Sequence, residues 1–499
     1  MDSGQFRLKL DESVQALREL LAREGFGQGE PSIGAELEMC IVGPEGAAKG
    51  LNEELRQAVG DPRVTLEVNR FNLELNTTPQ PFRGRAFFAL GKQMFELLSA
   101  LEKAAAQANA HIVTIGILPT LEESDLDSHS MTDAQRYEAL SVGLREIRGR
   151  PFHIKISGRD VVELSSEDIT LEGANTALQL HLRVDPERFG DVYDASNLAI
   201  GPVLALSANS PLLLGCDLWS ETRIPLFEQS VDVRSGAIHG AVGRCSLGVD
   251  WVRGGPDVLF EQAVRLYPPL LMELTDEDPL ETVRSGGVPK LYEMRLHHST
   301  VWRWNRAVYD PSGAGHCRIE MRALPAGPSM VDMLANAAFL LGLTLGLENE
   351  MESIRERMTF EQVSQNFYAA AQYGEDASLA WPGLCGVERL EACELVQRLI
   401  PVAMRGLISC NVDPEEAEEL LAIISERAVR RRTGARWQRD TLRAFEKRMP
   451  RNEALREMLL LYLKCASSGH PVSEWPIGDE PWGARGVARV DLWNAISPK

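Results

Sequence analysis

Glu67-Val68-Asn69-Arg70-Phe71-Asn72-Leu73-Glu74-Leu75-Asn76-Thr77-Thr78-Pro79 is the stretch that decides the fold of this chain. Polar and apolar residues alternate strictly from Asn72 to Asn76, and a period of two predicts a strand with one buried and one open face. Asn72, Glu74 and Asn76 therefore point to the same side. A carboxylate between two carboxamides can hold an ion or a polar ligand. For one strand alone, an ordinary solvated face is the simpler interpretation.

The same alternation recurs in three other segments with complementary chemistry: Glu36-Leu37-Glu38-Met39, Gln179-Leu180-His181-Leu182-Arg183 and Arg318-Ile319-Glu320-Met321-Arg322. If these faces adjoin in one sheet, four carboxylates converge: Glu36, Glu38, Glu74 and Glu320. Like charges about 4 Å apart repel by about 4 kcal/mol per pair at an effective dielectric near 20, so such a cluster requires cations. Oxygen ligands with one imidazole suit Mg²⁺ or Mn²⁺.

A further carboxylate, Glu67, precedes Glu74 by seven residues. This odd interval would place the two on opposite faces of an uninterrupted strand. A bend near Asn69-Arg70 would let both carboxylates serve one site.

Charge and cysteine usage restrict the function classes. The chain has 499 residues, a formal charge of −20 and a pI near 5.0, which argues against nucleic acid or anionic membrane as the main partner. None of its eight cysteines forms a Cys-x-x-Cys pair, which predicts a reduced, cytoplasmic protein without zinc or disulfides. The N-terminus has no apolar signal core. The apolar run from Met333 to Leu347 is shorter than a membrane span and predicts a buried helix.

Familiar nucleotide and nucleophile motifs are absent from the sequence. Neither Gly-x-x-x-x-Gly-Lys-Ser/Thr nor Gly-x-Gly-x-x-Gly occurs, which disfavours a P-loop or a Rossmann site. No Gly-x-Ser-x-Gly elbow occurs either.

Along the chain, the patterns predict strands and helices in alternation up to about residue 349. The apolar segment His111 to Thr120 predicts a central buried strand, Gly149 to Glu172 a hairpin or flap, and 216–310 an irregular region of lid or binding loops. From Ser353 to about Cys465 the pattern is helical. We therefore expect a catalytic domain over 1–349 and a helical C-terminal region with an irregular tail over 350–499.

With these residues in place, the chain resembles the glutamate–cysteine ligase family, within the glutamine synthetase-like carboxylate–amine ligases. The matching pieces stand in the family's order over roughly residues 30–345: Gly34-Ala35-Glu36-Leu37-Glu38, Glu67 to Glu74, Leu178-Gln179-Leu180-His181, Ala205-Leu206-Ser207-Ala208-Asn209-Ser210-Pro211 and Arg318-Ile319-Glu320-Met321-Arg322. Two departures concern the strand at Leu178, where the family usually has Gly-x-His, and the region after residue 350.

The resemblance implies an α+β fold in which an antiparallel curved sheet forms a funnel-shaped active site flanked by helices. It implies Mg²⁺ or Mn²⁺ bound by Glu36, Glu38, Glu67, Glu74, His181 and Glu320, with ATP as co-substrate. Arg322 would meet the transferred phosphoryl group, Glu320 would share in catalysis, and Arg223 would contact a phosphate or a carboxylate. Asn76 is a further candidate contact to the cofactor.

The implied activity is ATP-dependent joining of the γ-carboxylate of glutamate to an amine, most simply cysteine as in glutathione biosynthesis, through an acyl phosphate. Three alternatives stay open: another amine or acid on the same fold, a metal-dependent hydrolase, and a non-catalytic scaffold. The expected partners are these small molecules rather than nucleic acid or membrane. The oligomeric state is left open.

Overall fold

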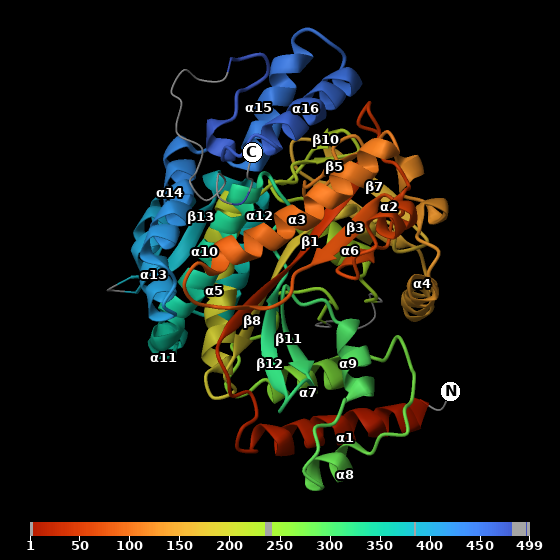
Figure 1. Ribbon diagram of the computed structural model, residues 1–499, viewed down its shortest axis with the longest axis vertical. Coiled ribbons are helices and arrows are strands. Elements are labelled where there is room, and N and C mark those ends of the chain that lie inside the picture. The colour runs from red at the N-terminus through yellow and green to blue at the C-terminus, as the bar shows by residue number, and fades with distance from the viewer. Residues whose placement is uncertain (1–2, 235–241, 384–385, 482–495, 497–499) are drawn as a thin grey trace.

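An antiparallel sheet of eight strands joins the segments that the alternation singled out (Figure 1). In the computed structural model, which describes residues 3–234, 242–383, 386–481 and 496, its main path runs β11-β12-β8-β1-β3-β2, while β4 and β5 both pair with β1. The strands are β1 (Ser32–Val42), β2 (Val64–Leu66), β3 (Asn72–Asn76), β4 (Gln80–Pro81), β5 (His111–Val113), β8 (Leu178–Val184), β11 (Asn305–Asp310) and β12 (His316–Met321). The sheet curls into a half-barrel, as predicted.

One face of this sheet is apolar and buried. In β1, Ile33, Ala35, Leu37 and Met39 are at most 2% exposed. The long helices α3 (Ala86–Gln107) and α10 (Met330–Leu347) contact the sheet, and α5 (Phe189–Ser207) packs against α10. Each strand has one face in the core, so its side chains are buried alternately. This is why the alternation of polar and apolar residues predicted these strands.

The most apolar helix of the chain lies inside this core. By length and composition, the run Met330–Arg357 could cross a membrane, but 94% of its apolar window is buried within the protein. Asp332, at its start, is fully buried and forms an ion pair with Arg427 at 2.8 Å. The prediction of a buried helix is confirmed.

Two groups of helices lie at opposite ends of the molecule (Figure 1). At one end lie α1 (Ser3–Leu21), α7 (Asp257–Leu266), α8 (Pro279–Arg284) and α9 (Tyr292–Ser299), and at the other α15 (Gly434–Glu446) and α16 (Arg451–Ala466). The others are α2 (Asn52–Val59), α4 (Gln135–Arg148), α6 (Arg223–Ser230), α11 (Met351–Arg357), α12 (Phe360–Tyr373), α13 (Ala392–Ser409) and α14 (Pro414–Arg430). Helix α13 packs along α10, so the C-terminal region shares the core of the eight-stranded sheet.

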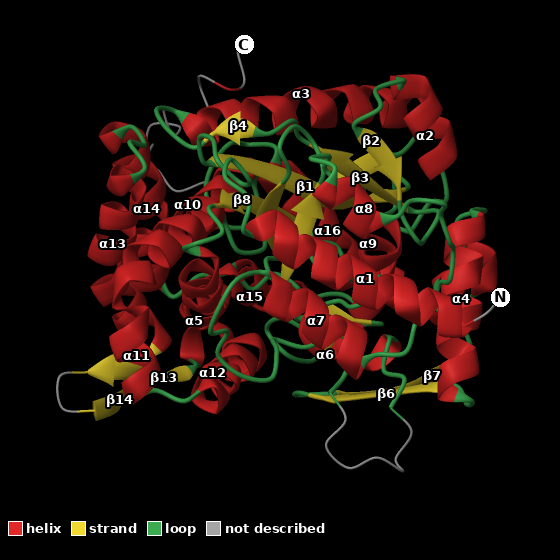
Figure 2. Cartoon of the chain, turned by 90° about the horizontal axis from the view of Figure 1, so that it is seen from below, coloured by secondary structure: helices red, strands yellow, loops and turns green. Residues whose placement is uncertain are grey.

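Among the described residues, three hairpins lie apart from the main sheet, and Figure 2 labels two of them. The third pairs β9 (Leu212–Leu213) with β10 (Cys216–Asp217), and the other two are longer. The first, β6 (Phe152–Ser157) with β7 (Val161–Ser166), was predicted as a hairpin or flap. The second, β13 (Ser378–Gly383) with β14 (Gly386–Glu391), interrupts the region that the sequence predicted as wholly helical. Pro382 and the glycines at 383 and 386 disfavour helix there. Of the predicted irregular tail, residues 482–495 and 497–499 lie outside the described part of the chain.

The predicted central strand His111 to Thr120 is wrong in extent and in place. Only His111–Val113 is a strand, and it pairs with β1 alone. The chain then turns beneath the polar face, where a Cβ on Gly116 would lie 3.0 Å from the side chains of Arg223 and Ser210. Beyond Val113 the chain packs against other segments of the protein, as at Gly116, whereas the sequence showed only an apolar run.

Candidate active site

The register of the sheet places the chemically active residues on its polar face. Glu38 of β1 lies opposite Glu74 of β3, and Glu320 of β12 lies opposite His181 of β8. Glu36 lies opposite Gln179. Residues directly opposite one another in adjacent strands share a face, so a single register brings four distant segments together.

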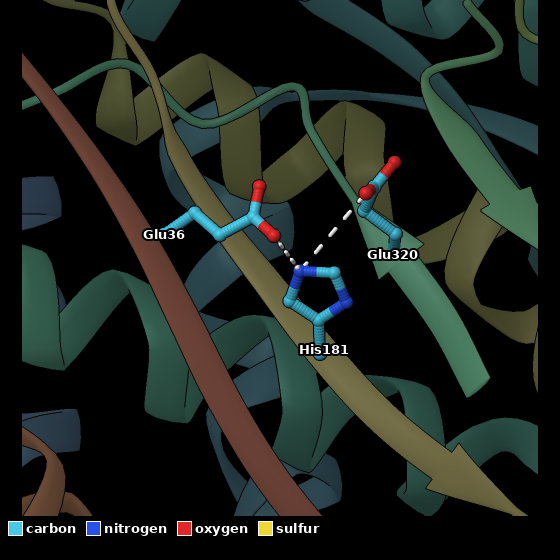
Figure 3. A group of neighbouring side chains, drawn as sticks. All are labelled: Glu36, His181 and Glu320. Atoms are coloured by element: carbon cyan, nitrogen blue, oxygen red, sulfur yellow. Dashed lines mark hydrogen bonds and ion pairs between the residues drawn. The ribbon is translucent and has the colours of Figure 1, made fainter. Parts of the chain in front are cut away.

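Glu36, His181 and Glu320 form a first group of possible metal ligands, with ligand atoms within 4.8 Å of one another (Figure 3). His181 Nε2 lies 2.9 Å from Glu36 Oε1 and 4.0 Å from Glu320 Oε1. His181 Nδ1 accepts a hydrogen bond of 3.0 Å from Arg318 Nε. Because Nδ1 accepts, the ring hydrogen is on Nε2 and is donated to Glu36.

Glu38, Glu67 and Glu74 form a second group of the same compactness. Glu67 follows the end of β2, and the chain bends between it and β3, so Glu67 and Glu74 reach the same place. Glu38 accepts hydrogen bonds from the Ala177 amide (2.8 Å) and from Gln179 Nε2 (2.7 Å). Three carboxylates thus meet because the chain bends between Glu67 and Glu74, as expected if both serve one site.

Electrostatics distinguishes the two groups. Burial, together with the neighbouring carboxylates, raises the pKa of Glu38 and of Glu74 to about 7 and also raises the pKa of Glu67. Burial alone would raise the pKa of Glu320 too, but the guanidinium groups of Arg306 and Arg322 hold it well below its usual range. Ionisation of the second group is therefore unfavourable in the metal-free protein, and a divalent cation would favour the ionised carboxylates.

Two arginines contact Glu320 from different directions. Arg306 of β11 donates from Nε and Nη2 to the two oxygens of Glu320, at 2.7 and 2.8 Å. Arg322 Nε lies 3.7 Å from Glu320 Oε2, and its buried Nη1 has no hydrogen-bond partner among the described residues. Arg322 thus retains a donor for a further anionic group.

Arg223 lies near these groups but contacts other partners, whereas Asn76 contacts the second group directly. Arg223 Nη1 donates to Glu221 (3.0 Å) and to the Ala323 carbonyl (3.1 Å), so it is fixed beneath the end of β12. Asn76 donates to Glu74 at 2.8 Å. Arg223 remains a candidate contact for an anionic substrate group, and the position of Asn76 suits orienting Glu74.

A narrow cavity of about 30 Å³ opens beside the second group, large enough for about two water molecules. Its walls carry carboxylates, guanidinium groups, amides, aromatic rings and a thiol: Glu38, Glu67, Glu172, Arg223, Arg303, Arg322, Asn72, Asn175, Gln179, Phe227, Trp302, Trp304 and Cys245, with Gly173 and Ala177. Several of these come from the segment 216–310, which the sequence assigned to binding loops.

Arg306, Arg318 and Glu172 were not assigned roles from the sequence. Arg306 belongs to Asn305–Asp310, where buried residues alternate with partly exposed ones, so its period of two was a usable signal. Arg318 shares a face with Glu320 and Arg322. Glu172 begins the short turn Glu172–Ala174 and belongs to no periodic pattern, so only the structure locates it at the cavity.

The C-terminal helices support the site through Asn209. Its side chain donates to the Ala326 carbonyl and to Tyr462 Oη, both at 2.8 Å, and its backbone amide donates to Glu221 at 2.8 Å. Gln438 of α15 donates to Asn209 in turn. Because Glu221 holds Arg223, the C-terminal region takes part in positioning a cavity residue.

The model of glutamate–cysteine ligase family 2 matches residues 32–459. The chain belongs to this family. The match crosses the predicted boundary at residue 349, and it includes most of the C-terminal helices. No curated protein sequence matches the chain.

Two solved structures resemble this chain to different extents. A glutamate–cysteine ligase of Francisella tularensis in complex with AMP matches with a TM-score of 0.54 and 11% identity, over 89% of this chain and 90% of that one. A bifunctional glutathione synthetase of Pasteurella multocida gives a TM-score of 0.43 and 14% identity, over 91% of this chain and 54% of that one. At this level of identity, the first match establishes the architecture.

Proposed function

We propose that this member of glutamate–cysteine ligase family 2 is an ATP-dependent ligase that joins the γ-carboxylate of glutamate to an amine, with cysteine as the first candidate. The observation that carries the proposal is the pair of ligand groups on one polar face, with Arg322 beside them. A carboxylate is a poor electrophile until it is phosphorylated. Phosphoryl transfer is catalysed mainly by positioning and by cations.

The donor sets fit Mg²⁺ or Mn²⁺, because five carboxylates and one imidazole provide hard oxygen and nitrogen ligands without thiolate. Glu36, His181 and Glu320 would hold one ion, and Glu38, Glu67 and Glu74 another. When bound, these ions would neutralise negative charge on the phosphate oxygens.

The protein's own side chains would orient the reactants. Arg322 would donate its unpartnered Nη1 to the phosphoryl group as charge develops on it. His181 could bind a metal ion through Nε2 only if the ring hydrogen were on Nδ1 instead. The hydrogen bond from Arg318 Nε to Nδ1 would then have to break. No protein nucleophile is needed, and burial raises the pKa of the Cys245 thiol well above its usual range.

We further propose that the chain functions in the cytoplasm with small molecules as its partners, and that residues 1–349 contain the catalytic sheet while 350–499 support it. The seven described cysteines are free, as a reducing compartment would allow.

The proposal is tested by phosphate release from ATP with glutamate and a panel of amines, and by trapping with hydroxylamine, which converts an acyl phosphate to a hydroxamate. We expect glutamate-dependent hydroxamate formation that requires Mg²⁺ or Mn²⁺. An ¹⁸O label in the γ-carboxylate should appear in the released phosphate. Hydrolysis of substrates without ATP, or ATP turnover that no carboxylic acid stimulates, would contradict the proposal.

A further inference from the structure

The ligase reaction proposed above needs a proton acceptor for its amine. An α-ammonium group is mostly protonated at pH 7 and has no free electron pair in that form. One proton must leave before nitrogen attacks the acyl carbon. As the C–N bond forms, the bond from carbon to the phosphate oxygen breaks, phosphate leaves with its electrons, and the second nitrogen proton passes to it.

We infer that Glu172 is the group that receives the ammonium of the acceptor amine and takes its first proton, an inference that rests on the function proposed above. Three carboxylates line the cavity, and two of them, Glu38 and Glu67, belong to the second ligand group. Glu172 belongs to neither group. Within the described residues, no histidine lines this cavity, so Glu172 is the carboxylate left for proton transfer.

The chain around Glu172 is held rigidly. Asn175 Nδ2 donates to the Glu172 carbonyl at 2.8 Å. Asn69 Nδ2 donates to the Thr170 carbonyl at 2.9 Å, which ties this turn to the bend beyond Glu67. Gly173 packs so closely on Asn69 that a Cβ would lie 2.7 Å from that side chain. The backbone of Glu172 is therefore fixed relative to the second ligand group.

The Glu172 side chain is available for a ligand. It has no hydrogen bond and no ion pair within 4 Å to any residue in the described ranges, and it is partly exposed where it lines the cavity. A carboxylate without a partner in the protein is stabilised by a cation that arrives with the substrate. A substrate ammonium supplies both that positive charge and the proton.

The other groups that line the cavity match the carboxylate and the side chain of an amino acid. Arg223 and Arg303 are each 2% exposed, and the Nε of each has no partner among the described residues. Their guanidinium groups suit a carboxylate. Phe227, Trp302 and Trp304 provide an apolar wall, and the narrowness of the cavity disfavours a large side chain. The acceptor class is thus a small α-amino acid whose ammonium faces Glu172.

The test compares two acceptors in the full-length Glu172→Gln variant with Mg²⁺ present. Hydroxylamine is mostly unprotonated at pH 7 and needs no base, whereas cysteine arrives as an ammonium. We expect the kcat with cysteine, or with each amino acid that the wild-type protein accepts, to fall by about 10²-fold or more. Hydroxamate formation should stay within about threefold of wild type, which also shows that the variant folds and activates glutamate.

Glu102→Gln is the matched control, because burial also raises the pKa of Glu102 but its side chain lines a different cavity. It should change neither rate. Equal losses with both acceptors, no loss with either, a raised KM for glutamate, or weaker Mn²⁺ binding in Glu172→Gln would each overturn the inference while leaving the ligase function standing. A wild-type protein that forms no hydroxamate would instead overturn the proposed function, and the inference with it.

Discussion

Arg306 holds both carboxylate oxygens of Glu320 in a two-pronged contact, although the two residues come from different strands. The Glu320 side chain is only 4% exposed, so its charge depends on this partner and on Arg322. The pair is one of several places where the protein itself neutralises part of the acidic face.

Removing the guanidinium of Arg306 should destabilise the metal-free protein strongly. An Arg306→Gln change leaves a buried carboxylate with only the longer contact to Arg322, and losing one partner of a buried pair costs about 3–5 kcal/mol. We expect a loss near the lower end, measured by urea unfolding in EDTA, with partial recovery in Mg²⁺. Arg18→Gln, in an exposed pair with Asp257, should cost less than about 1 kcal/mol. Equal losses in the two variants would argue against this role of Arg306.

The stability of the metal-free protein should decrease as pH rises from about 5 to about 7.5. Burial raises the pKa of Glu38 and Glu74 in the folded state, so the folded protein binds more protons than the unfolded chain in this range. Stability therefore falls as these protons are lost, and above the folded-state values the effect is complete. Urea unfolding in EDTA at several pH values measures this. A rise in stability over the same range, or an identical profile for Glu74→Gln, would contradict it.

Each chain should bind two Mn²⁺ ions. The two ligand groups are separate, and each has three donors within 4.8 Å. Titration followed by electron paramagnetic resonance should give about two sites in the wild type and one tight site in Glu74→Gln. Activity should disappear in excess EDTA. One ion in the wild type, or two tight sites in the variant, would show that the groups are not independent sites.

Arg322→Lys should reduce kcat by about 10²-fold or more, with little recovery in raised Mg²⁺. Lysine keeps the charge but lacks the planar fork that grips two phosphoryl oxygens. Glu320→Gln is the useful comparison, because it removes an anionic ligand, and raised Mg²⁺ or Mn²⁺ should restore part of its rate. Steady-state kinetics over a range of metal concentrations distinguishes the two. Near-normal turnover of both variants would exclude this site.

The period-two segments were predictable because sheet register follows from the buried face. Once Leu37, Leu73 and Ile319 must lie in the core, the polar residues between them share the opposite face. The odd spacing of Glu67 and Glu74 likewise required the bend that the structure contains. These inferences needed only local pattern.

Other features depend on packing that no local pattern records. Glu172 stands in a single turn, and its place at the cavity comes from the contacts of Asn69 and Asn175 with its neighbours. The sequence likewise does not show that the chain leaves the sheet after Val113 and packs closely against Arg223 at Gly116. The support of Arg223 by Asn209 and α15 joins segments more than two hundred residues apart, which explains why the C-terminal region had no visible role in the sequence.

The antiparallel order β12-β8-β1 has a consequence for folding during synthesis, because neighbouring strands come from distant parts of the sequence. Glu36 leaves the ribosome long before Glu320, and the helices that support Asn209 follow later still. The group Glu36, His181 and Glu320 is therefore incomplete until β12 has been synthesised. A divalent ion that needs all three ligands could stabilise the protein only after that point, so such an ion could not assist the folding of the earlier strands.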